Sequence, residues 1–337
     1  MRTLAALFLT SFTLISASSY AAGNILDQLD KMNIPRPAAE LAKVAIKGIS
    51  LQEIQLRLDT AVKNPYPIGL PKAGLDLGLN IEGTNLAKVA NSGVAIAAGK
   101  STTVPFDIKF AYQDLVSIYK KVTGKEALKL GLDGKIKLPL PVKQLKSKGL
   151  YFKGMPAELA FPFKADKLLP AVLPAINLRD FKIHQPTADE IKAAAGATLA
   201  STASTFISAL LSGANPGSAV KSGLGSLDLP IQTEFKLVLN NNAAAQVAFS
   251  NLKYDLFLGT EKFLSGAAAQ IENKGKESIV TVKSAFPVKS VSEGIAKAIS
   301  AKKATFKLNG SSGMKIPSLG GEGDVPFNFD HKGNLTW

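Results

Sequence analysis

The sequence contains no cysteine and only two histidines, so it lacks most of the side chains that carry out chemistry in enzymes. Without cysteine the chain has no disulfide, no thiolate nucleophile, no cysteine-containing zinc site and no cysteine for an N-terminal lipid anchor. His184 and His331 are far apart, and no histidine cluster has the spacing of metal ligands. Asp324 and Asp330 lie near His331, but a turn near the C-terminus is the favoured interpretation. No Gly-x-Ser-x-Gly or phosphate-loop motif is present. We therefore expect a protein that is not an enzyme and has no cofactor and no metal.

Arginine is also scarce, and lysine supplies nearly all of the positive charge behind a formal net charge of +14. Such a charge favours anionic partners, for example acidic lipid head groups or polyanions. A protein that reads nucleic acid usually carries more arginine, interleaved with aromatic residues. We therefore expect no specific nucleic-acid partner.

The lysines are concentrated in residues 120–153, where only Glu126 and Asp133 oppose them. One interpretation is that they solubilise the outer face of a sheet and protect its edges from pairing. The other is that they form a contact surface for anionic lipid or acidic client proteins, which low salt would strengthen. The lysines of this candidate surface are Lys120, Lys121, Lys125, Lys129, Lys135, Lys137, Lys143, Lys146, Lys148 and Lys153.

Long apolar runs are absent except at the N-terminus. There Arg2 precedes an apolar stretch at residues 4–17, and small residues follow at Ser19 and Ala21. This pattern predicts a signal peptide at residues 1–21, cleaved after Ala21. The alternative is an uncleaved membrane anchor, but the stretch is short for a membrane span. Export without disulfides is typical of a bacterial periplasm, where we expect a soluble or peripherally membrane-associated protein that is not a lipoprotein.

Two runs of alternating apolar and polar residues, at residues 54–62 and 75–81, organise the chain. This period is typical of strands that bury one face and expose the other. Between the runs, Pro65 and Pro67 lack the amide donors that a sheet ladder needs. The two runs therefore predict adjacent strands with a break between them.

The same unit returns near the C-terminus, at residues 235–239 and 252–258. Asn241 follows Asn64 by 177 residues, and Leu258 follows Ile81 by the same 177 residues, so the phase of the strands is preserved. An internal repeat of this kind indicates two copies of one β domain.

We expect the two copies to be tandem domains at residues 39–168 and 169–337, each containing strands and one short helix at its edge. The first helix is predicted at residues 115–122. The second is predicted to begin at a capping box, Ser290–Glu293, with Ile295 and Ile299 on its apolar face. Residues 22–38 precede the domains and are predicted to hold a short helix.

A helical insertion at residues 186–226 breaks the symmetry of the two copies. Thr187 and Glu190 form a capping box, and an apolar stripe follows to residue 212, with Gly196 as a predicted break. One interpretation is a structural cover over a sheet edge or over the cleft between the domains. The other is a surface that contacts client proteins or lipid through Leu199, Phe206, Ile207, Leu210 and Leu211.

Together these patterns resemble the WHy (water stress and hypersensitive response) domain of the late-embryogenesis-abundant type 2 family. The matching features are a strand that ends in Asn64-Pro65, an alternating second strand that leads to Gly83, and a further strand at residues 104–106 before a helix. The second copy departs from the pattern, because Asn241-Asn242 occurs where Asn-Pro is expected. The resemblance extends over both copies, except for the insertion.

The resemblance implies a mainly β fold of two tandem seven-stranded sandwiches, immunoglobulin-like or fibronectin III-like, each with an edge helix. It implies a role in desiccation and stress tolerance, with chaperone-like protection of other proteins. It assigns no catalytic residues.

We therefore expect a monomeric, non-enzymatic stress-protection protein of the envelope, which shields stress-sensitive client proteins or anionic membrane surfaces from aggregation and damage. The alternative is a periplasmic module that binds a lipid or another apolar ligand between the two domains, under the inserted helix.

Overall fold

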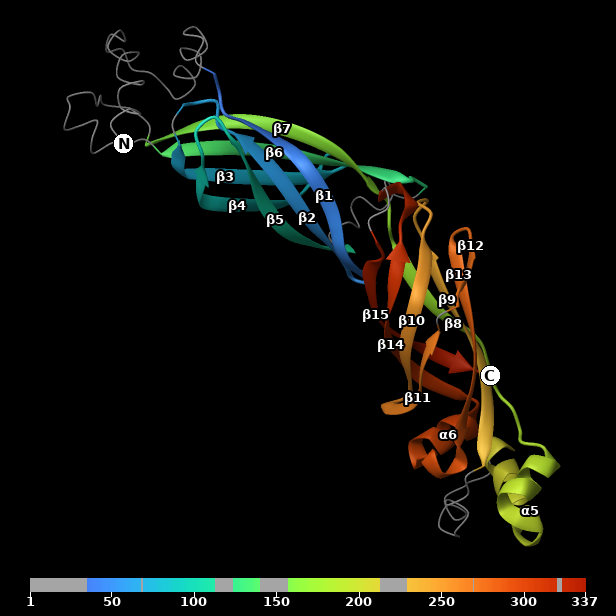
Figure 1. The fold of residues 1–337 in the computed structure, drawn as a ribbon. Helices are drawn as coiled ribbons and strands as arrows, with labels where there is room; N and C mark the ends of the chain where they lie inside the picture. The colour runs from blue at the N-terminus through green and yellow to red at the C-terminus, as the bar shows by residue number, and fades with distance from the viewer. Residues whose placement is uncertain are drawn as a thin grey trace, which may run out of the picture.

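The structure is a computed structural model that describes residues 35–67, 69–112, 124–139, 157–212, 229–268, 270–319 and 323–337. It is mainly β, with strands arranged in sandwiches that follow one another along an elongated molecule (Figure 1). The expected signal peptide, the helix in the N-terminal segment and the helix at residues 115–122 lie outside the described residues.

The first sandwich is built from antiparallel strands in two layers. One layer has the order β1-β2-β5 and the other the order β4-β3-β6-β7. Their bounds are β1 (Ala38–Ser50), β2 (Glu53–Lys63), β3 (Leu70–Ile81), β4 (Thr84–Ile96), β5 (Ser101–Ala111), β6 (Ala127–Pro139) and β7 (Glu158–Pro170).

The second sandwich repeats this pairing. Its layers have the orders β8-β9-β13-β12 and β11-β10-β14-β15, so each strand from β1 to β7 has a counterpart and β12 is an addition. The bounds are β8 (Pro174–Ile183), β9 (Pro230–Asn241), β10 (Ala248–Leu258), β11 (Glu261–Ala268), β12 (Glu272–Lys274), β13 (Glu277–Pro287), β14 (Lys303–Lys315) and β15 (Val325–Thr336). The repeat seen in the sequence is therefore also a repeat of strand pairing.

Alternation decides which side chains fill the sandwiches. On β2, Leu56, Leu58 and Val62 are buried. Arg57 and Asp59 lie on the outer face, where Arg57 Nε is 3.0 Å from Asp59 Oδ1. A strand side chain points to the opposite face from its neighbours, so this period places one apolar row in the core.

Each copy also holds a glycine opposite a phenylalanine in its last strand pair. Gly134 is paired with Phe163 in the first copy, and Gly310 with Phe329 in the second. A Cβ atom at either glycine would overlap the phenylalanine ring. The ring therefore covers the backbone of the facing strand, and only glycine leaves room for it.

Two α-helices lie in the second copy. Helix α5 (Ala188–Ser212) begins at the predicted capping box, where Thr187 and Glu190 hydrogen-bond each other reciprocally, which confirms this prediction. The predicted break is confirmed as well, because Gly196 has φ 75° and ψ 163° inside the helix.

Helix α6 (Glu293–Ala301) lies where the second edge helix was expected, but its N-cap is Ser292 and not Ser290. The Ser292 hydroxyl accepts the Ile295 N–H at 3.2 Å, whereas Ser290 ends the short 3₁₀ turn η5 (Val288–Ser290). The predicted capping box at Ser290–Glu293 is therefore wrong. Two serines precede the helix, and because Ser290 belongs to the 3₁₀ turn, Ser292 becomes the N-cap.

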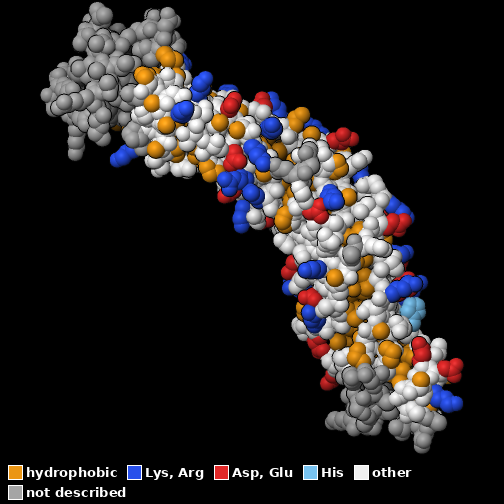
Figure 2. Space-filling model, in the orientation of Figure 1, with side chains coloured by type: hydrophobic (Ala, Val, Ile, Leu, Met, Phe, Trp, Pro, Cys, Tyr) orange, Lys and Arg blue, Asp and Glu red, His pale blue; other side chains and the backbone are white. Residues whose placement is uncertain are grey.

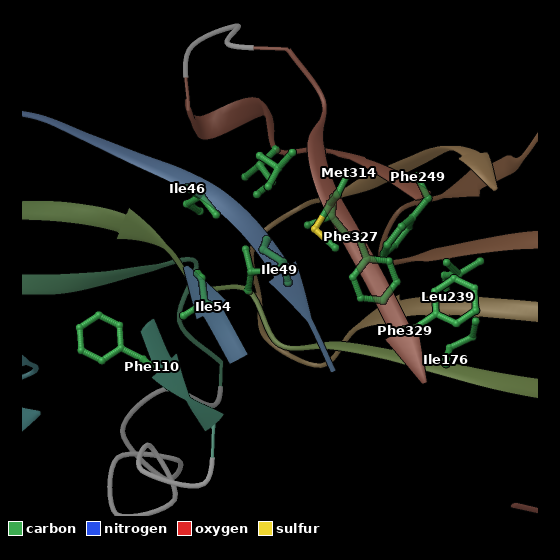
Figure 3. Close-up of a cluster of buried hydrophobic side chains, with 14 of the residues drawn as sticks. Ile46, Ile49, Ile54, Phe110, Ile176, Leu239, Phe249, Met314, Phe327 and Phe329 are labelled. Carbon is green, nitrogen blue, oxygen red and sulfur yellow. The ribbon is translucent and has the colours of Figure 1, made fainter. Parts of the chain in front are cut away.

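The two sandwiches share one sheet. The end of β1 pairs in parallel with the beginning of β15, with Ile49 opposite Phe327, so β11-β10-β14-β15-β1-β2-β5 form a continuous seven-stranded sheet. Beneath this pairing Ile46 and Ile49 of the first copy lie in one apolar cluster with Met314 and Phe327 of the second (Figure 3). The tandem copies thus have a common core, which the sequence pattern did not indicate.

Candidate functional surfaces

The Asn64–Pro65 motif ends β2 in a turn that the fully buried Asn64 side chain holds together. Its Oδ1 accepts the Tyr66 N–H at 3.0 Å, and its Nδ2 donates to the Ala97 carbonyl at 3.1 Å in the loop before β5. An asparagine that accepts a hydrogen bond from the backbone two residues ahead forms an Asx turn, which stops a strand. The motif is therefore structural in this position.

Asn241 holds the equivalent turn in the second copy, although no proline follows it. Its Oδ1 accepts the N–H groups of Ala243 at 3.2 Å and Leu173 at 2.7 Å. Its Nδ2 donates to the carbonyls of Ala171 at 3.1 Å and Ala245 at 2.7 Å. Ala171 and Leu173 lie between β7 and β8, so Asn241 fixes the connection between the sandwiches. Sequence reasoning identified the position by its offset but missed this role.

Gly83 lies in the two-residue turn between β3 and β4. Glu82 and Gly83 have φ values of 50° and 79°. Two successive positive φ values are typical of a type I′ hairpin turn. The Glu82 carboxylate accepts the Lys129 N–H at 2.9 Å and the Lys125 Nζ at 2.6 Å. The turn is thereby tied to the start of β6 (Ala127–Pro139), again a structural arrangement.

Four lysines of the candidate basic surface lie in the described part of the chain, and three of them are ion-paired. Lys125 pairs with Glu82, Lys129 with Asp166 at 2.8 Å, and Lys137 with Asp76 at 2.6 Å. Hydrogen bonds to these aspartates raise the pKa of Lys129 and Lys137. The other six, Lys120, Lys121, Lys143, Lys146, Lys148 and Lys153, lie outside the described residues.

These pairs cross the outer face of the sheet from strand to strand. Lys164 on β7 pairs with Asp133 on β6 at 3.3 Å, and Lys135 is the lysine of β6 for which no ion pair is found within the described residues. Figure 2 shows Lys and Arg side chains interspersed with Asp and Glu side chains along the face in view. On β6 the lysines therefore act as one half of a mixed-charge face, which favours the solubilising interpretation for these residues.

The inserted helix α5 turns part of its apolar stripe inward. Ile191, Ala203 and Ile207 are buried, and Leu211 is half-buried against the core. The prediction that Ile207 belongs to a surface that contacts client proteins or lipid is therefore wrong, because its side chain is fully buried. The side chains of Leu199, Phe206 and Leu210 lie outside what the structure describes.

The inserted helix does not lie between the sandwiches. It packs against α6, and Figure 1 shows both helices at the end of the second sandwich that is remote from the first. The region between the sandwiches is occupied instead by the shared apolar cluster. The hypothesis of one ligand site formed by the interdomain region and this helix is contradicted by the distance between the two.

The residues near the C-terminus form a strand and not the expected turn. His331 points inward, with its ring 5.5 Å from that of Phe306, and burial lowers its pKa although Asp330 opposes this shift. Asp330 points outward and pairs with Lys307 at 3.2 Å, while Asp324 hydrogen-bonds Ser250. Alternation along β15 thus separates side chains that are close in sequence, and no carboxylate–histidine cluster forms among them.

Neither a metal centre nor a spanning helix is found in the described part of the chain. Among those residues no group of three or more His, Asp and Glu side chains could hold a metal ion. None of their helices combines the length and the apolarity needed to cross a membrane.

The chain is similar to late embryogenesis abundant proteins. A family model described as late embryogenesis abundant protein matches residues 59–148, from within β2 to just beyond β6. No curated protein matches the chain.

Two solved structures are similar to about half of the chain each. One is the solution structure of a protein from Arabidopsis thaliana, at 15% identity and TM-score 0.34, over 47% of this chain and 88% of that one. The other is the solution structure of a putative late embryogenesis abundant protein, at 21% identity and TM-score 0.32, over 44% of this chain and 84% of that one. At these scores the likeness bears on neither the sites nor the function.

Proposed function

We propose that this protein is a non-enzymatic stress-protection protein of a bacterial envelope, exported by its N-terminal signal and acting on stress-sensitive client proteins. The molecule would lie between partly dehydrated clients, contact them weakly and limit their aggregation. The match of residues 59–148 to late embryogenesis abundant proteins supports the link to stress. A peripheral contact with anionic membrane surfaces is a secondary part of the proposal, supported by the net charge of +14.

The observation that carries the proposal is the chemistry of the outer sheet faces. In the second copy, as in the first, lysines pair with carboxylates of the same face, for example Lys262 with Asp255 at 2.8 Å and Lys236 with Asp180 at 2.7 Å. Surface ion pairs contribute little to stability, so we expect them to act on hydration and association instead. A face that mixes both signs of charge stays hydrated and resists association.

Among the described residues, large apolar side chains on the surface are correspondingly few. Leu168, at 69% exposure, is the large hydrophobic side chain that stands out as exposed in the part of the chain described. A surface without a large apolar patch has no strong binding site for an unfolded protein. This favours shielding by weak contacts over tight chaperone-like capture.

The test is a drying and heating assay with the mature protein, residues 22–337. A dehydration-sensitive enzyme is dried and rehydrated, or heated, with this protein or with an equal mass of albumin. We expect the enzyme to retain more activity and to scatter less light with this protein. Protection no better than that by albumin would remove the main support for the proposal.

A pair of variants tests whether the mixed-charge faces act in protection. Lys307→Leu with Asp330→Leu replaces an outer ion pair by an apolar pair, and we expect weaker protection by the folded variant. The control, Lys307→Asp with Asp330→Lys, keeps both charges and should protect as the wild type does. Sedimentation with vesicles of anionic or neutral lipid, at low and high salt, tests the secondary membrane contact.

A further inference from the structure

Asn309 and Gly310, in the middle of β14, form the one Asn-Gly pair of the sequence. In such a pair the backbone nitrogen of the glycine can attack the side-chain amide carbon of the asparagine, because glycine has no side chain to hinder the approach. After every other asparagine of the chain comes a residue with a side chain, for example Ser92 after Asn91. Asn309 is therefore the asparagine that deamidates most readily when the chain is free to move.

The fold requires the glycine of this pair. A Cβ atom at Gly310 would overlap the Phe329 ring and the Lys253 carbonyl. The residue before the glycine differs between the copies, because the corresponding pair of the first copy is Asp133-Gly134. Packing therefore retains the glycine, and the residue at position 309 decides whether the pair contains an amide that can be lost.

The side chain of Asn309 lies between two carboxylates on the outer face of the seven-stranded sheet. Asn309 is directly opposite Asp255 of β10 and Asp330 of β15. Each aspartate already has a cation, because Asp255 Oδ1 is 2.8 Å from Lys262 Nζ and Asp330 Oδ2 is 3.2 Å from Lys307 Nζ. Asn309 Oδ1 is buried and accepts no hydrogen bond within the described part of the chain. This row of side chains thus has a neutral residue at its centre.

The first copy has a carboxylate at the same position, in different surroundings. Asp133 lies opposite Gly78 of β3 and Lys164 of β7, and its Oδ1 is 3.3 Å from Lys164 Nζ. Asp133 therefore has a cation directly opposite on one side and no charge on the other, whereas a carboxylate at position 309 would have an anion on both sides. Like charges directly opposite each other on neighbouring strands are destabilising. The amide of Asn309 avoids this repulsion.

The sheet keeps the Asn-Gly pair unreactive. β14 is paired on both sides, with Gly310 opposite Tyr254 and Phe329, so its backbone is extended and its N–H groups lie in the plane of the sheet. The Asn309 side chain stands out of that plane, away from the Gly310 nitrogen. Ring closure therefore requires β14 to leave the sheet, which happens only when this part of the protein unfolds.

We propose that Asn309-Gly310 is a deamidation site that the folded sheet protects and that unfolding makes reactive. In the unfolded chain the Gly310 nitrogen loses its proton and bonds to the side-chain carbonyl carbon of Asn309, and the side-chain nitrogen leaves as ammonia. Water then opens the cyclic imide at either carbonyl group, which gives aspartate or isoaspartate. The proposal does not depend on the protective function.

Both products disturb the second sandwich when the chain folds again. Aspartate places a third anion in the row between Asp255 and Asp330. Isoaspartate adds one carbon atom to the backbone of β14, which shifts its register against the strands on both sides. A molecule that stays unfolded for long therefore does not regain its original stability, even without aggregation.

Peptide mapping by mass spectrometry tests the reaction. The mature protein is kept in neutral buffer, with and without urea above its unfolding transition, and samples are taken over several days. We expect the unfolded chain to deamidate at Asn309 faster than at any other asparagine, and the folded protein to keep Asn309 intact. The proposal is overturned if Asn309 converts no faster than the other asparagines, or if the folded protein converts as fast as the unfolded chain.

Asn309→Thr is the matched control, because threonine is neutral, suits a strand and has no amide to lose. Wild type and variant are held in urea for increasing times and then diluted into buffer. The urea midpoint of each refolded protein is measured by circular dichroism. We expect the midpoint of the wild type to fall with the time spent in urea and that of the variant to stay constant. An equal fall in both would assign the loss to another reaction and contradict the role of Asn309.

Asn309→Asp reproduces the aspartate product without a chemical reaction. We expect this variant to lower the folding equilibrium constant roughly fivefold, because it adds two like-charge pairs to the sheet. Lys253 and Lys332 lie diagonally from position 309, which limits the effect. Urea denaturation measures the constant.

A second background shows whether the neighbouring charges cause this loss. Asp330→Lys gives position 309 the neighbour that Asp133 has in the first copy, where Lys164 is the cation. In this background Asn309→Asp should cost much less than it does in the wild type. An equal loss in both backgrounds would contradict the part assigned to the acidic row.

Discussion

The two sandwiches share the same strand pairing, apart from the added β12, and the same glycine–phenylalanine pairs, yet they differ in the loops and insertions at their ends. The loop after β9 donates one amide, that of Ala244, to the Lys125 carbonyl of the first sandwich, whereas the equivalent position in the loop after β2 is Pro67, which has no amide donor. The insertion after β8 (Pro174–Ile183) has no equivalent after β1 (Ala38–Ser50). The two copies thus agree in their strands and differ at their ends. The following predictions test which shared features the copies depend on and which differences separate them.

The largest expected effect comes from a feature that both copies share. A Cβ atom at Gly310 would overlap the Lys253 carbonyl of the backbone as well as the Phe329 ring. We expect Gly310→Ala to lower the free energy of unfolding by about 3 kcal/mol, because neither the backbone nor the buried ring can move freely. Urea denaturation followed by circular dichroism measures the change.

The matched variant in the first copy is Gly134→Ala. There the three atoms nearest to the Cβ position all belong to the Phe163 ring, which is half-buried, so the ring can turn outward. We expect a smaller loss, about 1–2 kcal/mol. Equal losses at the two glycines would show that the backbone contact at Gly310 does not add to the loss of stability.

The second prediction concerns the asparagines that end β2 and β9. Asn241→Ala leaves four backbone groups, in three buried hydrogen bonds and one half-buried one, without their side-chain partner, and we expect the free energy of unfolding to fall by about 2 kcal/mol. Because two of these groups lie in the connection between the sandwiches, the variant should also loosen the junction in small-angle scattering. Asn64→Ala should destabilise its turn and leave the junction unchanged. If both variants loosened the junction, the proposed difference between Asn241, which holds the junction, and Asn64, which holds only its own turn, would be contradicted.

The third prediction concerns a difference inside the cores. Thr60 on β2 is fully buried, and its hydroxyl has no hydrogen-bond partner among the described residues, whereas its counterpart in the second copy is Leu237. An unpaired buried hydroxyl costs free energy that an apolar group of the same shape avoids. We expect Thr60→Val to raise the free energy of unfolding by about 1 kcal/mol. A loss of stability on thermal and urea unfolding would indicate that the hydroxyl has a partner in solution.

The smallest expected effect depends on pH. Burial lowers the pKa of His331, so the folded protein binds this proton more weakly than the unfolded chain does. Stability should therefore fall as the pH is lowered through the region just below the ordinary histidine pKa of about 6.5. The counterpart of His331 in the first copy is Ala165. His331→Ala should remove this part of the pH dependence of urea unfolding. If the free energy of unfolding of the variant changes with pH as that of the wild type does, other groups are responsible for the dependence.

Much of the fold could be predicted from the sequence because alternation and turn residues are local signals. The runs at residues 54–62 and 75–81 are strands, and the constant offset located their copies, but the prediction that the two runs are adjacent is wrong, because they lie in different sheets of the sandwich. The capping box at Thr187 and the break at Gly196 also follow from short-range chemistry. The choice between Ser290 and Ser292 as N-cap could not be predicted, because it depends on how the 3₁₀ turn leaves β13.

The candidate surfaces were harder to predict because they depend on contacts distant in sequence. A count of lysines in residues 120–153 cannot show that Asp76 and Asp166, on other strands, pair with Lys137 and Lys129. The apolar stripe of α5 likewise did not reveal that Ile207 faces inward. The departure from Asn-Pro at Asn241 was visible in the sequence, but its meaning required knowing which loop meets the other copy.

The pairing of Ile49 with Phe327 also has a consequence for how the chain folds. These two residues belong to the first and last strands, so nearly the whole chain forms the loop that their contact closes. Contacts between residues so distant in sequence form late and slow folding. If the N-terminus leaves a membrane first, the edge of β1 stays incomplete until the C-terminal strand has been released. In such a chain, the seven-stranded sheet could be completed only after the C-terminal strand had been released.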